Sequence, residues 1–131
     1  MKKIMILVMV VSSVSMALAQ QASGVRHLSV TEYQRAIDSV KDEIIIDLRT
    51  PEEIRQGIIT NARQIDFFGA GFEPAIAKLN KDKVYFLYCA SGARSGETVV
   101  LMEKMGFKTL YNLNGGFREW LAKKMPVSEK K

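Results

Sequence analysis

The chain has 131 residues, enough for one domain built around a single hydrophobic core. An apolar fraction of 47% and a charged fraction of 25% are those of an ordinary globular protein and exclude a chain that is disordered throughout. The net charge of +5 comes from lysines and arginines scattered along the chain, which favours a solvated mixed surface over a nucleic-acid-binding patch. Residues 126–131 form a short charged tail outside the predicted domain.

Residues 1–19 have the organisation of a secretory signal peptide. Two lysines are followed by an apolar run over 4–11, and Ala17-Leu18-Ala19 provides a small-x-small cleavage site. The alternative is an uncleaved membrane anchor, but a spanning helix needs about 20 apolar residues and this run is shorter. We therefore expect cleavage after Ala19. The mature protein would carry a charge of +3, because two lysines and no acid are lost, and it would work in the periplasm or outside the cell, free of the membrane.

Segments of strand and helix character alternate through the rest of the chain. Strands are expected over 25–28, 43–48, 62–65, 84–88 and 109–113. Helices are expected over 29–40, briefly after residue 50, and over 72–79, 95–105 and 117–124. This alternation is typical of a parallel sheet covered by helices on both faces. With no internal repeat and no linker, residues 20–125 are predicted to form one α/β domain.

The early elements carry clear boundary signals. Ser29 and Glu32 have the spacing of a capping box at the start of a helix. The β-branched run 44–46 suits a strand that is buried on both faces. Thr50-Pro51, followed by acids, marks a second helix start, and Gly57 is expected to end that helix after a few residues.

Cys89 is the only cysteine in the sequence. Exported proteins meet an oxidising environment, in which cysteines usually occur in disulfide pairs. Here no internal disulfide can form, so the unpaired thiol calls for a functional explanation. The alternative is a buried and inert cysteine at the end of a strand.

The loop that begins at this cysteine favours the functional explanation. It reads Cys89-Ala90-Ser91-Gly92-Ala93-Arg94-Ser95 and lies between a buried strand and a helix. A loop of small residues with a central glycine can turn successive amides inward, and the helix N-terminus adds partial positive charge. This environment lowers the pKa of a cysteine and makes it a nucleophile at neutral pH.

Three motifs in the same order resemble those of the rhodanese family and span nearly the whole mature chain. The loop at Cys89 matches the family's Cys-x-x-Gly-x-Arg-Ser active-site loop. Residues 45–57 resemble its early strand-and-helix motif. Asn114-Gly115-Gly116-Phe117, with Trp120, resembles its closing Gly-Gly-aromatic-x-x-Trp motif.

The resemblance implies a five-stranded, mainly parallel sheet with helices on both faces. It also implies that Cys89 takes a sulfane sulfur from thiosulfate or a persulfide, becomes a persulfide, and passes the sulfur to cyanide, a thiol or an acceptor protein. No cofactor is implied. Contacts to the persulfide sulfur and to the anionic donor would come from the amides of the loop and from Arg94, that is, from Ala90, Ser91, Gly92, Ala93, Arg94 and Ser95.

Phosphatase chemistry is the neighbouring alternative for such a loop. Cysteine-dependent phosphatases place their arginine one position further from the cysteine, which widens the ring to accept phosphate. Here Arg94 is followed directly by Ser95, and the tighter loop favours sulfur over phosphorus.

Some residues depart from the family pattern or allow two interpretations. Residues 57–62 lack the family's histidine, having Ile58 in its place, and carry Asn61 where a glycine is usual; this puts the donor in question more than the chemistry. Asn is the next best residue for a positive φ. Asp47 and Arg49 are candidate supporting residues, but an acid and a base at a strand end more often form a structural pair.

Other polar and sulfur-containing residues are expected to be structural. The two glycines at 115–116 would form a tight turn beneath the active loop, and Trp120 would lie in the core. His27, the only histidine, is expected at the surface. The methionines over 102–125 would fill the core, and no His/Cys cluster predicts a metal site.

Two further functions compete with a sulfurtransferase. The first is a persulfide carrier or interaction module without turnover, suggested by the altered residues 58 and 61. The second is a thiol redox protein, which would need a resolving cysteine that this chain lacks.

Overall fold

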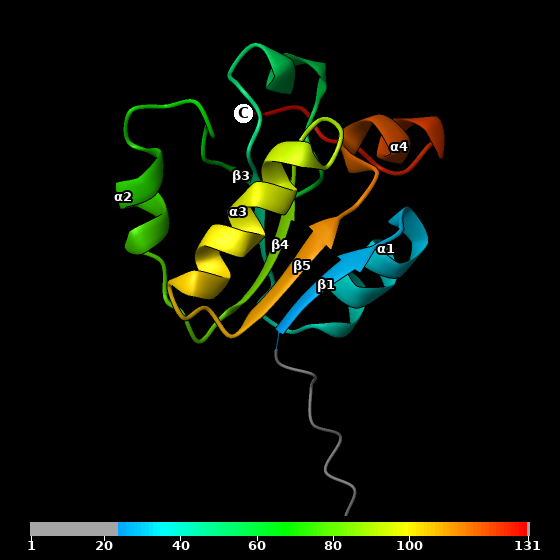
Figure 1. Cartoon of the computed structure of the whole chain (residues 1–131). Coiled ribbons are helices and arrows are strands. Elements are labelled where there is room, and N and C mark those ends of the chain that lie inside the picture. Colours follow the sequence, from blue (N-terminus) through cyan, green and yellow to red (C-terminus); the bar gives the residue numbers. More distant parts are fainter. Residues whose placement is uncertain (1–23, 131) are drawn as a thin grey trace, which may run out of the picture.

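A computed structural model describes residues 24–130, so the predicted signal peptide lies outside the described residues. Five strands form one sheet in the order β1-β5-β4-β2-β3, and every pair is parallel (Figure 1). The strands are β1 Gly24–Leu28, β2 Ile44–Asp47, β3 Arg63–Gln64, β4 Val84–Tyr88 and β5 Thr109–Leu113. The helices are α1 Val30–Ser39, the 3-10 helix η1 Glu53–Gln56, α2 Phe72–Ala77, α3 Ala93–Lys104 and α4 Gly116–Ala122.

The helices cover both faces of the sheet, as the alternating sequence predicted. In Figure 1, α1 and α4 lie on one side of the sheet, and α2 and α3 on the other. Along β4, Phe86 and Tyr88 belong to the hydrophobic cluster beneath α1 and α4, whereas Tyr85 and Leu87 belong to the cluster beneath α2 and α3. This alternation follows from the two-residue period of a strand. It explains why a strand that is buried on both faces of the sheet is apolar at every position.

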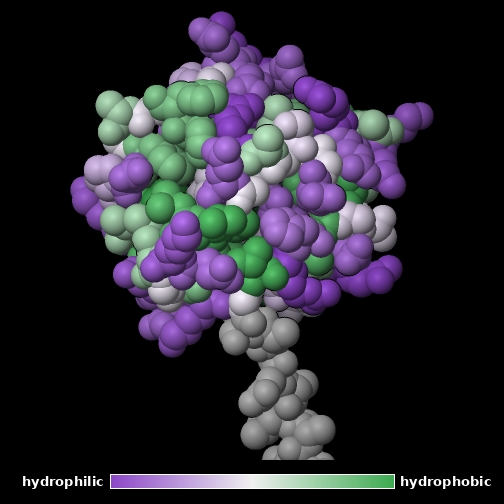
Figure 2. Space-filling view, in the orientation of Figure 1, coloured by the Kyte–Doolittle hydropathy of each residue, from purple (hydrophilic) through white to green (hydrophobic). Residues whose placement is uncertain are grey.

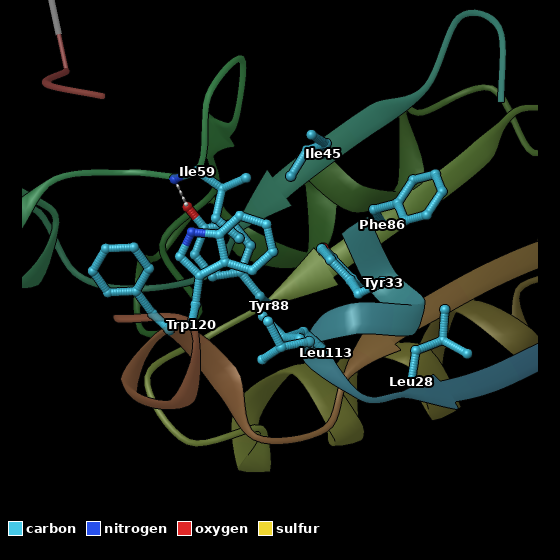
Figure 3. Close-up of a cluster of buried hydrophobic side chains, with 10 residues drawn as sticks. Leu28, Tyr33, Ile45, Ile59, Phe86, Tyr88, Leu113 and Trp120 are labelled. Atoms are coloured by element: carbon cyan, nitrogen blue, oxygen red, sulfur yellow. Dashed lines mark hydrogen bonds between the residues drawn. The ribbon is translucent and has the colours of Figure 1, made fainter. Parts of the chain in front are cut away.

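The cluster beneath α1 and α4 is built around aromatic rings (Figure 3). Tyr33 of α1 meets Phe86 edge-to-face, with the ring centroids 5.4 Å apart, and Trp120 of α4 at 6.3 Å. Trp120 is 1% exposed, and its ring nitrogen donates a hydrogen bond to the carbonyl of Pro126. The prediction that Trp120 lies in the core is therefore confirmed.

The capping signals predicted for the first two helices are present in the structure. Ser29 caps α1, its hydroxyl accepting a hydrogen bond from the amide of Glu32. After β2, Thr50 and Glu53 cap each other reciprocally through backbone amides and side-chain oxygens. Gly57, at φ 107°, then ends the segment as predicted, and its four helical residues form a 3-10 helix, in which the amide of Gly57 donates to the carbonyl of Ile54 three residues earlier.

The C-terminal segment packs against the domain. Ser128 pairs with Ile58 through two backbone hydrogen bonds of 2.8 Å, and its hydroxyl lies 2.8 Å from that of Thr60. Lys130 donates a hydrogen bond to the side chain of Gln64. The charged composition of the segment gives no indication of this pairing, which depends on a strand-like segment distant in sequence. Among residues 24–130, no helix is long and apolar enough to cross a membrane.

Candidate active site

Cys89 follows β4 at the carboxyl edge of the sheet, where α/β proteins bind their ligands. The turn after it ends at Gly92, whose φ of 96° lies in the left-handed region. Glycine is required there both for this φ and because a Cβ would collide with the backbone carbonyl of Asn114. Helix α3 begins at Ala93, two residues earlier than predicted, because Gly92 completes the turn. Arg94 and Ser95 therefore lie in its first turn.

The thiol of Cys89 is surrounded by hydrogen-bond donors. The amide of Gly92 donates to Sγ at 3.1 Å and that of Ser95 at 3.5 Å, while the hydroxyl of Ser95 lies 3.4 Å from Sγ. Burial raises the pKa of this thiol, but the hydroxyl and amide of Ser95 and the amides of Ser91 and Gly92 outweigh burial and lower the pKa below its usual value. The thiol of Cys89 therefore ionises to the thiolate at lower pH than an ordinary cysteine does.

Helix α4 holds the loop with its amides turned toward the sulfur. The amide of Phe117 donates to the carbonyl of Cys89 at 2.8 Å, and the amide of Arg118 donates to the carbonyl of Ala90 at 3.0 Å. Because these carbonyls point outward to α4, the amides that follow can point inward. Gly116, at φ 64°, permits this contact, since a Cβ there would lie 2.5 Å from the carbonyl oxygen of Ala90. The predicted turn beneath the loop is thus present.

The predicted loop residues divide into two groups. The amides of Gly92 and Ser95 lie within hydrogen-bond distance of the sulfur, and the amide of Ser91 contributes to the lowered pKa of Cys89. Within the described residues, no hydrogen bond joins Sγ to the amides of Ala90, Ala93 or Arg94. Ala90 contributes its carbonyl to the contact with α4, and the other two residues belong to the first turn of α3.

Arg94 is engaged by a carboxylate that the sequence did not assign to the site. Its two terminal nitrogens bind the two oxygens of Glu53 at 2.7 and 2.8 Å. The hydrogen bonds from Arg94 hold the pKa of Glu53 near 2, assisted by the amide of Thr50 and opposed by partial burial. The sequence predicts Glu53 as a helix-start acid within the early family motif, and not as a partner of the loop at Cys89. The available signal is its position just after a predicted strand, because the carboxyl ends of parallel strands meet at one edge of the sheet. In the structure that strand, β2, lies beside β4.

Asp47 and Arg49, the predicted supporting candidates, form a buried ion pair. Nη2 of Arg49 lies 2.7 Å from Oδ2 of Asp47, and both side chains are at most 2% exposed. Oδ2 also accepts a hydrogen bond from the hydroxyl of Tyr88 at 2.6 Å. That hydroxyl in turn accepts a hydrogen bond from the amide of Ile59 (Figure 3). The sequence predicts Tyr88 only as the last residue of an apolar strand, because its neighbours in the fold are distant along the chain.

Arg49 connects this network to the site. Its guanidinium lies 3.9 Å from the ring centre of Phe117 and donates hydrogen bonds to the carbonyls of Glu53 and Gly57. Burial opposes the charge of Arg49, but Asp47 outweighs burial and raises the pKa of Arg49. Arg49 thus stays charged and positions the segment that carries Glu53, which is a structural contribution to the site.

A hollow of about 290 Å³ opens beside the loop at Ala90. This volume is close to the lower end of the range for small-molecule sites. The lining residues are Arg49, Glu53, Gln56, Ala90, Phe117, Arg118 and Leu121. Ile58, which replaces the family histidine, is not among them; it is 9% exposed and pairs with Ser128. Asn61 adopts the expected positive φ, at 69°.

The remaining polar predictions concern residues away from the loop. His27 is exposed on β1 and lies 3.0 Å from the side-chain amide of Asn112, so its surface placement is confirmed. In the part of the chain that the structure describes, no group of three or more His, Cys, Asp or Glu side chains could hold a metal ion.

Comparison with known proteins identifies the family. The profile of the rhodanese-like domain matches residues 29–123. A sulfurtransferase of Allochromatium vinosum is 33% identical over 94 residues, which cover 72% of this chain and 85% of that protein. A rhodanese-like domain protein of Staphylococcus aureus superposes with a TM-score of 0.68 at 27% identity, covering 81% of this chain and 99% of the other.

A polysulfide-sulfur transferase homodimer of Wolinella succinogenes has a similar structure, with a TM-score of 0.66 and 27% identity over 80% of this chain and 79% of that one. The sheet order, the loop at Cys89 and the profile match agree with one another. The chain belongs to the rhodanese-like domain family.

Proposed function

We propose that this protein is a sulfurtransferase that moves a sulfane sulfur through a persulfide on Cys89. The observation that carries the proposal is the set of donors around Sγ: the amides of Gly92 and Ser95 and the hydroxyl of Ser95. These donors favour an anion on sulfur both before and after the sulfur is accepted. The sulfurtransferase named among the relatives supports the same chemistry.

In the loading step, the thiolate of Cys89 attacks the outer sulfur of the donor. A Cys–S bond to that sulfur forms while the donor's S–S bond breaks, and the electron pair leaves with the remainder of the donor. With thiosulfate the products are the Cys89 persulfide anion and sulfite; with a persulfide they are the Cys89 persulfide anion and a thiolate. Charge is conserved in both cases, so no oxidant, reductant or cofactor is required.

In the unloading step, an acceptor attacks the terminal sulfur of the persulfide. Cyanide leaves as thiocyanate, or a thiolate leaves as a new persulfide, and the Cys89 thiolate is regenerated in either case. A small anionic donor and a thiol or cyanide acceptor are therefore the proposed partners. An acceptor protein is a further candidate, since its thiolate would react in the same way.

The test compares the unaltered protein with Cys89→Ser and with Ser39→Ala as a control. Ser39 is exposed at the end of α1, where its hydroxyl donates a hydrogen bond to the carbonyl of Ala36, so the control keeps the loop and the nucleophile. We expect thiocyanate formation from thiosulfate and cyanide in the unaltered protein and the control, and none in Cys89→Ser. If Cys89 takes up no sulfur from thiosulfate or from a persulfide, the proposal is wrong.

A persulfide carrier without turnover is distinguished by mass spectrometry. Loading adds one sulfur atom, about 32 Da, to the intact protein. A stable adduct that neither cyanide nor a small thiol removes would identify a carrier. Rapid loss of the adduct with formation of product would identify an enzyme.

The proposed place of action is the periplasm or the exterior, after cleavage behind Ala19. The support is the organisation of residues 1–19, with its charged start, apolar run and small-x-small end. Intact mass of the exported protein is the measurement. A mass that includes residues 1–19 would contradict cleavage and favour a retained anchor.

A further inference from the structure

The charges around the hollow beside Cys89 are almost completely paired. Arg49 is neutralised by Asp47, and Arg94 by Glu53. Arg118, which is exposed at the N-terminal end of α4, has no carboxylate within ion-pair distance among residues 24–130. Of the two arginines that line the hollow, only Arg118 is unpaired, so the hollow offers an incoming anion one free cation; Arg94, which pairs with the lining residue Glu53, does not line it.

Glu53 is positioned to act on that anion directly. Its side chain is 33% exposed and lines the hollow, while both carboxylate oxygens bind Arg94. On its other side, the Arg94 guanidinium lies 5.4 Å from the ring centre of Phe68. Phe68 is 69% exposed. Figure 2 shows hydrophobic surface over the segment that leads into α2. Arg94 is thus held between a carboxylate and an aromatic ring.

We propose that Glu53 determines donor specificity by opposing doubly charged donors more strongly than singly charged ones. The inference rests on the proposed sulfur transfer through Cys89. A negative charge beside the entry path repels a dianion twice as strongly as a monoanion, because Coulomb energy is proportional to the donor's charge. Thiosulfate is such a dianion, whereas a persulfide or thiosulfonate carries one negative charge at its reacting end.

Glu53 also has a second effect in the same direction. By pairing with Arg94, it removes the cation that the loop sequence offers to an oxyanion. Glu53 itself stays ionised at every ordinary pH, because Arg94 holds its pKa near 2. The discrimination is therefore a constant property of the site above about pH 4.

Two donors with similar leaving groups isolate the effect of charge. Thiosulfate releases sulfite, and methanethiosulfonate, CH3SO2S⁻, releases methanesulfinate when the Cys89 thiolate takes its outer sulfur. In both reactions one S–S bond forms, one breaks and the charge is conserved. The measured quantity is the ratio of kcat/KM for thiosulfate to kcat/KM for methanethiosulfonate, with cyanide as the acceptor.

The decisive variant is Glu53→Gln, and Glu52→Gln is its matched control. Both remove one negative charge from adjacent residues, but Glu52 is exposed, and among residues 24–130 the carboxylate that pairs with Arg94 is that of Glu53. We expect Glu53→Gln to raise the ratio about tenfold, and Glu52→Gln to change it by no more than about twofold, since Glu52 does not line the hollow and solvent and salt screen its charge from a donor there. A merely structural role for Glu53 would lower both kcat/KM values and leave the ratio unchanged.

Arg118→Gln provides a second, independent variant at an exposed position. It removes the unpaired cation, so the ratio should fall by several-fold, opposite in direction to Glu53→Gln. An unchanged ratio in either folded variant overturns the inference, because charges at the hollow would then not select the donor. Failure of the unaltered protein to load sulfur from both donors would instead contradict the proposed function.

Discussion

Gly116 lies directly against Ala90, and this contact joins α4 to the loop that carries Cys89. A Cβ at Gly116 would approach the carbonyl oxygen of Ala90 to 2.5 Å and the amide nitrogen of Ser91 to 2.7 Å. Both atoms are backbone and cannot turn away. The close approach lets the amides of α4 bind the outward-facing carbonyls of the loop, so the inward direction of the loop amides depends on this glycine.

Replacement of Gly116 by alanine should therefore affect both stability and reactivity. The positive φ of 64° and the clash with Ala90 together predict a loss of about 2–4 kcal/mol in the free energy of unfolding. Gly71→Ala is the control, because its φ is −93° and a Cβ there meets nothing within 4 Å. Urea unfolding measures stability, and alkylation of Cys89 reports the loop. Equal stability of the two variants would show that α4 tolerates displacement from the loop.

Ser95→Ala should raise the pKa of Cys89. The hydroxyl of Ser95 stabilises the thiolate, so its removal favours the neutral thiol and moves the titration to higher pH, by about one pK unit. The measurement is the rate of Cys89 alkylation between pH 5 and 10. In the unaltered protein the midpoint should lie below that of an ordinary cysteine. Ser91→Ala, which keeps the Ser95 hydroxyl, should show the unaltered midpoint. A midpoint that does not move in Ser95→Ala would mean that the amides alone set the pKa.

Tyr88→Phe should destabilise the protein. The hydroxyl bridges Oδ2 of Asp47 and the amide of Ile59, both buried, and its loss leaves each without this partner. We expect a loss of about 2–3 kcal/mol in the free energy of unfolding. Tyr85→Phe is the matched control on the opposite face of β4, since it loses a single, partly exposed hydrogen bond to the carbonyl of Asn80. A smaller loss in Tyr88→Phe than in the control would argue against the network.

The pairing of Glu53 with Arg94 predicts a specific pH dependence of stability. The folded-state pKa near 2 lies below the ordinary value of 4.5, so the ionised form is favoured by folding. The stabilisation that Glu53 contributes is complete above about pH 4.5 and is lost as the pH falls toward 2. The difference in unfolding free energy between the unaltered protein and Glu53→Gln should accordingly be constant from pH 7 to 5 and shrink by pH 3. A constant difference down to pH 3 would mean that protonation of Glu53 does not control this stability.

The sequence by itself determined the architecture and predicted Cys89 as the nucleophile. Alternating apolar strands and capped helices predict a parallel sheet with helices on both faces, since each pattern reports a local period that the backbone imposes. The spacing from Cys89 to Gly92 and Arg94 predicts the loop for the same reason: its residues are consecutive, so local geometry suffices. The boundaries of β4 and β5 are likewise those that the sequence predicts.

Only the tertiary structure decided how this loop is surrounded. The partners of Arg94 and Tyr88 come from a neighbouring strand and its following segment, and the carbonyls of Cys89 and Ala90 are bound by α4. Such pairings depend on strand order and on the docking of helices, and a period along the chain carries no information about either. The sequence offers Arg94 as a free cation; the fold places Glu53 against it, because β2 and β4 are neighbours that end at the same edge.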